Sequence, residues 1–306
     1  MLDTNTKTRE FKFDSTHYIK ALFELMKPRV MSLAIFTCVV GFLIAPYKSV
    51  DYLYAILSIT AVALGSGAAG SLNCWYEADV DKVMSRTCLR PIPTGRLTKK
   101  EALIFGVISS FVSVVALYFF SNLMAASLLA LTILFYVFVY TIWLKRKTPQ
   151  NIVIGGAAGA LPPVIGWAIA TGSVSIEPII LFLIIFVWTP SHFWALSLFK
   201  SEDYKKANIP MLPLISGTEK TKKNIFVYSL LMLVPILAMY FINMVTLYYF
   251  ILSTVLTSYY IYLCYNLRET KTPKKSNLLA KKIFTYSIMY LFFLFLFLLI
   301  DNTYQI

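Results

Sequence analysis

The chain has 306 residues, of which 58% are hydrophobic and only 14% are charged, and its formal net charge is +13. A soluble domain of this length is more polar, so the composition indicates a polytopic membrane protein. The four widely spaced cysteines favour neither a disulfide framework nor a zinc site. The chain has only two histidines, which argues against a haem or copper carrier with several histidine ligands.

Repeated apolar segments of about twenty residues predict an all-α bundle of about nine transmembrane helices. They form one predicted domain, 30–301, between a polar arm at 1–29 and a short tail at 302–306. The arm lacks the features of a secretory signal, and its acidic residues are unlike those of a transit peptide. The predicted spans are 30–47, 51–72, 102–120, 123–144, 152–171, 178–199, 225–243, 246–266 and 283–301.

The basic residues predict the orientation of the chain. All of the 28 lysines and arginines except Lys48 fall in the arm or in the loops after the second, fourth, sixth and eighth spans. Short loops rich in lysine and arginine stay on the cytoplasmic side, or on the matrix side in a mitochondrion. We therefore predict a cytoplasmic N-terminus and a C-terminus on the opposite side. The lack of a transit peptide favours the bacterial cytoplasmic membrane. The positive charge then reflects topology, and no nucleic-acid partner is expected.

A polar cluster follows the second span, where small residues lead into Asn73, Glu77 and Asp81. Their i, i+4, i+8 spacing predicts one shared helix face, from which Asp79 turns away. Carboxylates near the membrane interior are costly and usually functional. One amide oxygen and two carboxylates suit a hard divalent cation such as Mg²⁺. The alternative is a solvated helix end.

A second acidic pair, Glu202 and Asp203, follows the sixth span beside Lys200. If the two basic loops close over one cavity, the two acidic clusters face each other across it. Such an arrangement fits a Mg²⁺-bound polyanion, and diphosphate is the obvious candidate. Because the cavity opens into an apolar bundle, a prenyl diphosphate is the expected substrate. An ordinary pair of loop acids is the alternative.

Candidate phosphate contacts surround these clusters. Arg86 and Arg90 follow the first cluster, and Lys145 comes directly after the fourth span. Arginine recognises planar phosphate groups and lysine acts as a point charge, although each residue also fits the role of a membrane anchor. His192 lies within a long apolar segment. It is either a hydrogen-bonded core histidine or a substrate contact.

The N-x-x-x-E-x-x-x-D spacing of Asn73, Glu77 and Asp81 resembles the first aspartate-rich motif of the UbiA superfamily of intramembrane prenyltransferases. Longer segments resemble the protohaem IX farnesyltransferase family within it: Lys27-Pro28-Arg29, NCWYEADVDKVMSRTCLRPIPTG, NIVIGGAAGALPPVIGW and SHFWALSLFKSEDYKKANIPMLP. The superfamily carries a second D-x-x-x-D motif where this chain has Lys200, Glu202 and Asp203.

The resemblance implies that Mg²⁺ assists ionisation of farnesyl diphosphate, that the 2-vinyl group of haem B attacks, and that water adds to give haem O. It implies a UbiA-type bundle in the lipid bilayer and contact with a haem A synthase or oxidase assembly machinery. The implied catalytic residues are Asn73, Glu77, Asp81 and Asp203. The implied metal ligands are Asn73, Glu77 and Asp81 for one Mg²⁺, and Asp203 and Glu202 for a second. The implied substrate-binding residues are Arg86, Arg90, Lys145, Lys200 and His192.

Two alternatives remain open at this point. A quinone-pathway prenyltransferase would act on an aromatic ring, but the SHFWAL and EDYKKANIPMLP segments favour the haem family. A cation-coupled transporter would place its carboxylates near the bilayer midplane. The charge pattern instead puts them at cytoplasmic helix ends beside clustered cations.

Overall fold

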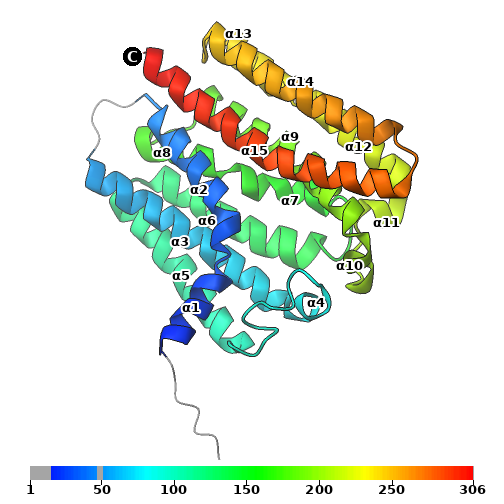
Figure 1. Ribbon diagram of the computed structural model, residues 1–306. Coiled ribbons are helices and arrows are strands. Elements are labelled where there is room, and N and C mark those ends of the chain that lie inside the picture. Colours follow the sequence, from blue (N-terminus) through cyan, green and yellow to red (C-terminus); the bar gives the residue numbers. More distant parts are fainter. Residues whose placement is uncertain (1–14, 47–50, 306) are drawn as a thin grey trace, which may run out of the picture.

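The computed structural model describes residues 15–46 and 51–305, which form helices and connecting loops with no strand among them (Figure 1). The predicted all-α fold is confirmed. Four short helices lie beside the long ones: α1 (Ser15–Leu25), α4 (Ala78–Val83), α10 (Ser201–Lys206) and α11 (Leu212–Ser216). The long segments are α2 (Pro28–Leu43), α3 (Tyr52–Tyr76), α5 (Lys99–Phe120), α6 (Leu123–Leu134) with η1 (Phe135–Leu144), α7 (Asn151–Ala160) with α8 (Pro162–Thr171), α9 (Ile176–Phe199), α12 (Thr218–Leu231) with α13 (Leu233–Phe241), α14 (Leu247–Glu269) and α15 (Pro273–Gln305).

Eight of these segments are long and apolar enough to cross a membrane. A ninth appears if α1 and α2, which meet at a bend of 58°, count as one broken span. Every predicted span coincides with one of these segments, so the prediction of about nine spans is confirmed. Two spans are interrupted next to prolines, because proline lacks the N–H that would continue the helical hydrogen bonds. Pro162 begins α8, and Pro235 lies in the first turn of α13.

Part of the predicted arm, residues 1–14, lies outside the described residues. Residues 15–25 of the predicted arm form α1, whose Ala21 and Leu25 are buried against Cys74 and Ala102. At the other end, α15 continues through the predicted tail as far as Gln305. The division into arm, domain and tail stays a prediction.

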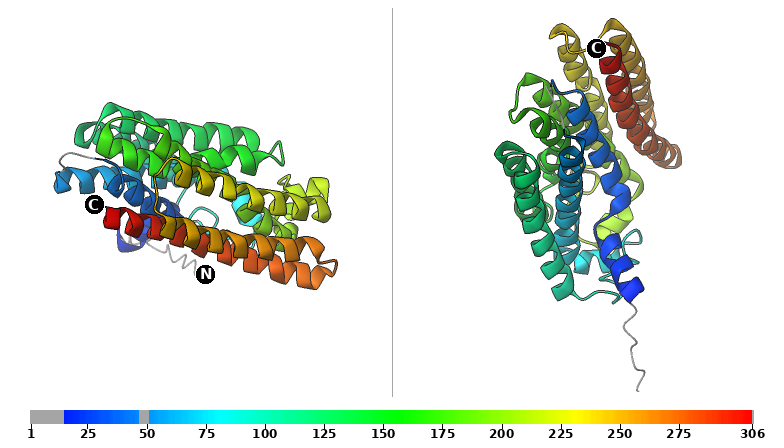
Figure 2. Two further views of the ribbon diagram at one scale, coloured as in Figure 1. Left: turned by 90° about the horizontal axis from the view of Figure 1, so that it is seen from above. Right: turned by 90° about the vertical axis from the view of Figure 1, so that its left-hand side faces the viewer.

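The bundle has two distinct ends. The short helices α4, α10 and α11 lie at one end, whereas the C-terminus and α8 lie at the other (Figure 1). Helix α9 lies centrally and contacts α7, α8, α12, α13 and α15. Figure 2 shows α14 and α15 on one side of the bundle and α5 and α6 on the other. The polar clusters predicted from the sequence therefore gather at one end.

Helices α2 and α8 approach unusually closely at two glycines. A Cβ added at Gly166 would lie 1.9 Å from the carbonyl oxygen of Cys38, and one at Gly41 would lie 2.2 Å from that of Pro163. Small residues allow backbone contact between membrane helices, which lipid does not drive together by the hydrophobic effect. This contact fixes α2, whose first residues reach the polar end of the bundle.

We expect Gly166→Ala to destabilise the protein by about 1–3 kcal/mol, because the added methyl group overpacks a backbone contact. Thermal melting of the detergent-solubilised protein should show a lower Tm. Gly159→Ala is the matched control, since a Cβ there meets nothing within 4 Å. A Gly166→Ala variant that melts with the wild type would contradict the assigned contact.

Candidate active site

A cavity of about 470 Å³ opens between α2, α3, η1, α7, α9 and α15. Its volume lies in the range of small-molecule sites. Apolar side chains form much of its wall, among them Leu33, Ile152, Ile185, Phe193 and Leu291. Polar and charged side chains from the α4 end of the bundle also line it. The cavity therefore suits a ligand with a hydrocarbon part and a charged head.

The first polar cluster lies in this cavity. Asn73 belongs to the last turn of α3, Asp81 lies in α4, and Glu77 stands at the break between the two helices. The N–H of Glu77 still donates to Asn73 O at 3.0 Å, and the N–H of Asp81 donates to Glu77 O at 2.8 Å. Helical spacing thus survives the break and keeps the three side chains together. Each is only 2% exposed.

Two cations neutralise the two carboxylates. Lys145 Nζ donates to Glu77 Oε2 at 2.5 Å, and Arg90 Nη1 lies 2.9 and 2.8 Å from Asp81 Oδ1 and Oδ2. Burial alone would lower the pKa of the Lys145 ammonium, but the charge of Glu77 and its hydrogen bond outweigh burial and raise that pKa. Both cations stay charged at neutral pH, so the pairs form a compensated resting arrangement.

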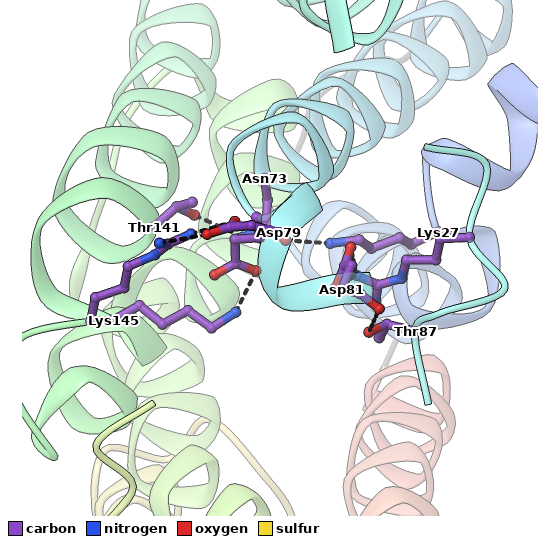
Figure 3. A network of polar contacts seen from close by, with 10 residues as sticks. Lys27, Asn73, Asp79, Asp81, Thr87, Thr141 and Lys145 are labelled. Carbon is purple, nitrogen blue, oxygen red and sulfur yellow. Dashed lines mark hydrogen bonds and ion pairs between the residues drawn. The ribbon is translucent and has the colours of Figure 1, made fainter. Parts of the chain in front are cut away.

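Asn73 is held from both sides (Figure 3). Its Nδ2 donates to Thr141 Oγ1 at 3.0 Å, and its Oδ1 accepts from Lys27 Nζ at 2.6 Å. Because Thr141 takes the amide nitrogen, the amide oxygen is directed to the Lys27 side, where both residues border the cavity. The sequence pattern assigns no role to Thr141 or Lys27.

The donor set fits a magnesium ion. Glu77 Oε1 is buried and has no hydrogen-bond partner, which is costly unless a cation or another donor meets it. The Asn73 amide and the Asp81 carboxylate supply further hard oxygens of the kind Mg²⁺ prefers. Within the described residues, no three His, Cys, Asp or Glu side chains form a metal-binding group. An ion here would rely on one amide, two carboxylates and oxygens from a ligand.

The second predicted cluster lies beside the cavity rather than in its wall. Asp203 Oδ2 accepts a hydrogen bond from Ser85 Oγ at 2.6 Å, with Lys200 Nζ 3.8 Å away. Glu202 is exposed on α10. None of Lys200, Glu202 and Asp203 lines the cavity, whereas the adjacent Tyr204 does. Asp203 thus joins the loop after α4 to α10, and its role at a second metal stays a prediction.

His192 forms part of the cavity wall. Ser287 Oγ donates its hydrogen to Phe284 O at 2.7 Å and lies 2.6 Å from His192 Nδ1, so the hydroxyl oxygen accepts a hydrogen bond from Nδ1–H. The neutral ring therefore leaves Nε2 as an acceptor. The imidazole stacks between Trp188 and Phe284, with centroids 4.2 and 4.5 Å away. This packing fixes the plane of the ring.

Asp79 has a different task from its neighbours. Its two oxygens accept from Arg146 at 2.8 and 2.9 Å, and the Arg146 guanidinium lies 5.1 Å from the centre of the Tyr76 ring. These hydrogen bonds from Arg146 lower the pKa of the Asp79 carboxyl. The exposed pair ties α4 to the loop after η1, which carries Lys145.

The π-helix η1 explains why the sequence pattern missed part of the wall. An α-helix turns about 100° per residue, so Tyr136 and Lys145, nine residues apart, would face opposite ways. The i→i+5 bonds of a π-helix reduce the turn to about 80°, which returns both to one face. The bond from Lys145 N–H to Tyr140 O has this spacing, and all three residues line the cavity.

Comparison with known proteins agrees with this geometry. Residues 34–299 match the UbiA prenyltransferase family. The chain belongs to that family. It is 60% identical to a protohaem IX farnesyltransferase from Pelagibacter ubique over 99% of each chain. It is 52% identical to a protohaem IX farnesyltransferase from Bartonella henselae, over 90% of this chain and 88% of the relative.

Solved structures support the UbiA-type bundle. A structure described as that of a digeranylgeranylglyceryl phosphate synthase matches with a TM-score of 0.77 at 20% identity, covering 93% of this chain and 98% of that one. A UbiA homologue from Archaeoglobus fulgidus, bound to DMAPP and Mg²⁺, matches with a TM-score of 0.66 at 16% identity, covering 88% and 98%. The predicted family and fold are confirmed, and the chain is a multi-pass membrane protein.

Thr141→Val should raise the Mg²⁺ concentration needed for half-maximal activity by about 10–100-fold, as losses of outer-shell partners do. Valine removes the acceptor for Asn73 Nδ2, so the amide is no longer held with its oxygen at the site. Thr141→Ser keeps the hydroxyl and should restore the Mg²⁺ dependence. If valine leaves that dependence unchanged, Thr141 does not position Asn73.

Proposed function

We propose that this chain transfers the farnesyl group of farnesyl diphosphate to the 2-vinyl group of haem B, with addition of water, to give haem O and diphosphate. The observation that carries the choice of haem is near-full-length identity of 49–60% to proteins named protohaem IX farnesyltransferase. The cavity supports the other substrate, because apolar walls adjoin a cluster of cations and oxygen donors.

The residues of the first cluster are assigned to Mg²⁺. Asn73, Glu77 and Asp81 would hold the ion through one amide and two carboxylate groups. The Archaeoglobus fulgidus homologue, described as bound to DMAPP and Mg²⁺, supports the choice of Mg²⁺ as the ion. The bound ion would neutralise charge on the departing diphosphate. Asp203, with Glu202, is our candidate for a second ion. For these two carboxylates to bind an ion in the cavity, α10 would have to lie closer to the cavity than it does here.

The cations are assigned to the leaving group. Arg90 and Lys145 already lie in the cavity, and the exposed Arg86 lines its mouth. As the C1–O bond of farnesyl diphosphate breaks, positive side chains fixed around the phosphates stabilise the growing negative charge without rearrangement of solvent. Lys200, at the start of α10, would reach the phosphates from the rim.

The apolar wall is assigned to the carbon chemistry. The farnesyl C1 bonds to the terminal vinyl carbon of haem B, water adds at the other vinyl carbon, and a proton is released. Trp188, Phe193 and Phe284 surround His192 and line the cavity, which limits water around the allylic cation. His192 offers the haem its unprotonated Nε2.

Orientation and location complete the proposal. The basic loops lie at the end of the bundle with α4 and α10, and the C-terminus lies at the opposite end (Figure 1). This supports a cytoplasmic active-site end and a C-terminus across a bacterial cytoplasmic membrane. We assign residues 30–301 to one prenyltransferase domain. Contact with a haem A synthase or with oxidase assembly machinery stays a prediction, which co-purification of the partner would test.

Purified protein incubated with haem B, farnesyl diphosphate and Mg²⁺ should produce haem O, which mass spectrometry identifies by its added hydroxyethylfarnesyl group. Chelation of Mg²⁺ should stop the reaction and readdition should restart it. An aromatic hydroxybenzoate acceptor should remain unmodified in a parallel incubation. Prenylated hydroxybenzoate without haem O would replace our proposal by the quinone-pathway alternative.

Asp81→Asn should lower turnover at least about a hundredfold, because it removes a carboxylate from the assigned ion and from Arg90. The protein should remain inserted and folded, as judged by its Tm. Asp79→Asn is the matched control from the same short helix, and we expect its activity to stay within a few-fold of wild type. Near-normal activity of Asp81→Asn would remove Asp81 from the metal site.

A further inference from the structure

The first turns of α15 carry a stripe of exposed lysines, called the lysine stripe below. Five exposed positions form it: Lys274, Lys275, Leu278, Lys281 and Lys282. Because an α-helix turns about 100° per residue, these positions fall within an arc of about 120°. Ser276, Ala280 and Ile283 are buried and occupy the opposite side of the helix. The lysine stripe therefore faces away from the bundle.

The length of α15 places the lysine stripe at the membrane surface. The helix has 33 residues. Between Lys282 and Asp301 no residue is charged, and at 1.5 Å per residue this segment spans about 27 Å. The hydrocarbon core of a bilayer is about 30 Å thick, so the uncharged segment fills it. The four lysines then lie at the depth of the lipid headgroups and just outside them.

The lysines of the stripe have no acidic partner in the protein. Among the described residues, none of the four has a carboxylate within ion-pair distance. Lys282 Nζ lies 5.8 Å from the centre of the Tyr259 ring. The exposed Arg96, by contrast, pairs with Glu24. Membrane topology requires lysines on this side of the bilayer but does not require them on one face of one helix. The grouping of unpaired charge therefore points to an external anion.

Aromatic and apolar side chains adjoin the lysine stripe. Leu278, in its middle, is 69% exposed, and Tyr259 and Tyr262 of the neighbouring α14 are 41% and 57% exposed. Tyrosine is enriched at the interface between lipid and water. Exposed leucine beside lysine is typical of helices that lie at the boundary between headgroups and acyl chains. A phospholipid offers a phosphate and an acyl chain together, so it fits this surface better than a soluble acidic protein does.

We propose that the lysine stripe binds the phosphate groups of anionic phospholipids and anchors the α14–α15 hairpin to the surrounding leaflet. Basic clusters next to a membrane helix attract anionic headgroups in this way. The anchor bears on the cavity, because Phe284, Ile288 and Leu291 of the same helix line its wall. The proposal requires only a bilayer around the protein and is independent of the proposed reaction.

Lipid titration of the detergent-solubilised full-length protein tests the proposal, with native mass spectrometry as the readout. Wild type should bind phosphatidylglycerol more tightly than phosphatidylcholine. Removal of four charges should lower the affinity for phosphatidylglycerol at least about tenfold in a stripe variant that combines four changes: Lys274→Gln, Lys275→Gln, Lys281→Gln and Lys282→Gln.

The matched control removes the same charge from exposed lysines in the loops after the second and sixth spans: Lys99→Gln, Lys100→Gln, Lys205→Gln and Lys206→Gln. Since both variants have the same net charge, a difference between them reports the position of the lysines. The control should bind phosphatidylglycerol within about twofold of wild type. A folded stripe variant, judged by its Tm, that binds phosphatidylglycerol as the control does would overturn the proposal.

The wild-type protein supplies a second measurement that needs no variant. In nanodiscs, an amine-modifying reagent should label Lys281 and Lys282 several-fold less when phosphatidylglycerol replaces phosphatidylcholine, as read by peptide mass spectrometry. Lys99 and Lys100 should change much less. Equal protection of all four lysines would reduce the effect to general surface charge and contradict a specific site. Protection by glycerol phosphate, which lacks acyl chains, would assign the stripe to free phosphate instead of lipid.

Discussion

Compensation of buried charge governs the arrangement of this protein. Two carboxylates and an amide lie 2% exposed at one end of an apolar bundle, where an unpaired ion is strongly unfavourable. Each meets one cation, and the three cations come from different elements: the α1–α2 elbow, the loop after α4 and the end of η1. The folding of three distant segments is thereby tied to one site.

The same pairing makes the site responsive to a ligand. The same carboxylate and amide groups supply the oxygens that a hard cation prefers, and a side chain displaced by such an ion would be free to bind phosphate. Binding therefore exchanges partners among charges already in place, and little solvent has to reorganise. Lys27 stands apart from the other two cations, because it donates to the neutral amide of Asn73 and not to a carboxylate.

The sequence was sufficient for the spans, for the end of the bundle that carries the charges, and for the shared face of Asn73, Glu77 and Asp81. Each followed from apolar length or from a four-residue spacing that the break at Glu77 preserves. The irregular parts of the backbone could not be predicted from the sequence. The alignment of Tyr136 with Lys145 depends on i→i+5 hydrogen bonds. The contact of Lys27 with Asn73 depends on the left-handed conformation of Lys27 before Pro28. The Asp203–Ser85 bond joins two loops whose closeness no local pattern encodes.

The glycine runs connect packing with chemistry. In α3, Gly67 and Gly70 admit the elbow, and in α7 a Cβ at Gly155 would lie 2.1 Å from the Tyr140 ring. Lipid offers membrane helices no hydrophobic reason to associate, so close contact depends on small residues at chosen positions. Here those positions adjoin residues of the cavity wall or their immediate neighbours. A side chain added there would collide with Met26, next to Lys27, or with Tyr140 of the cavity wall, so the small residues belong to the site as much as to the fold.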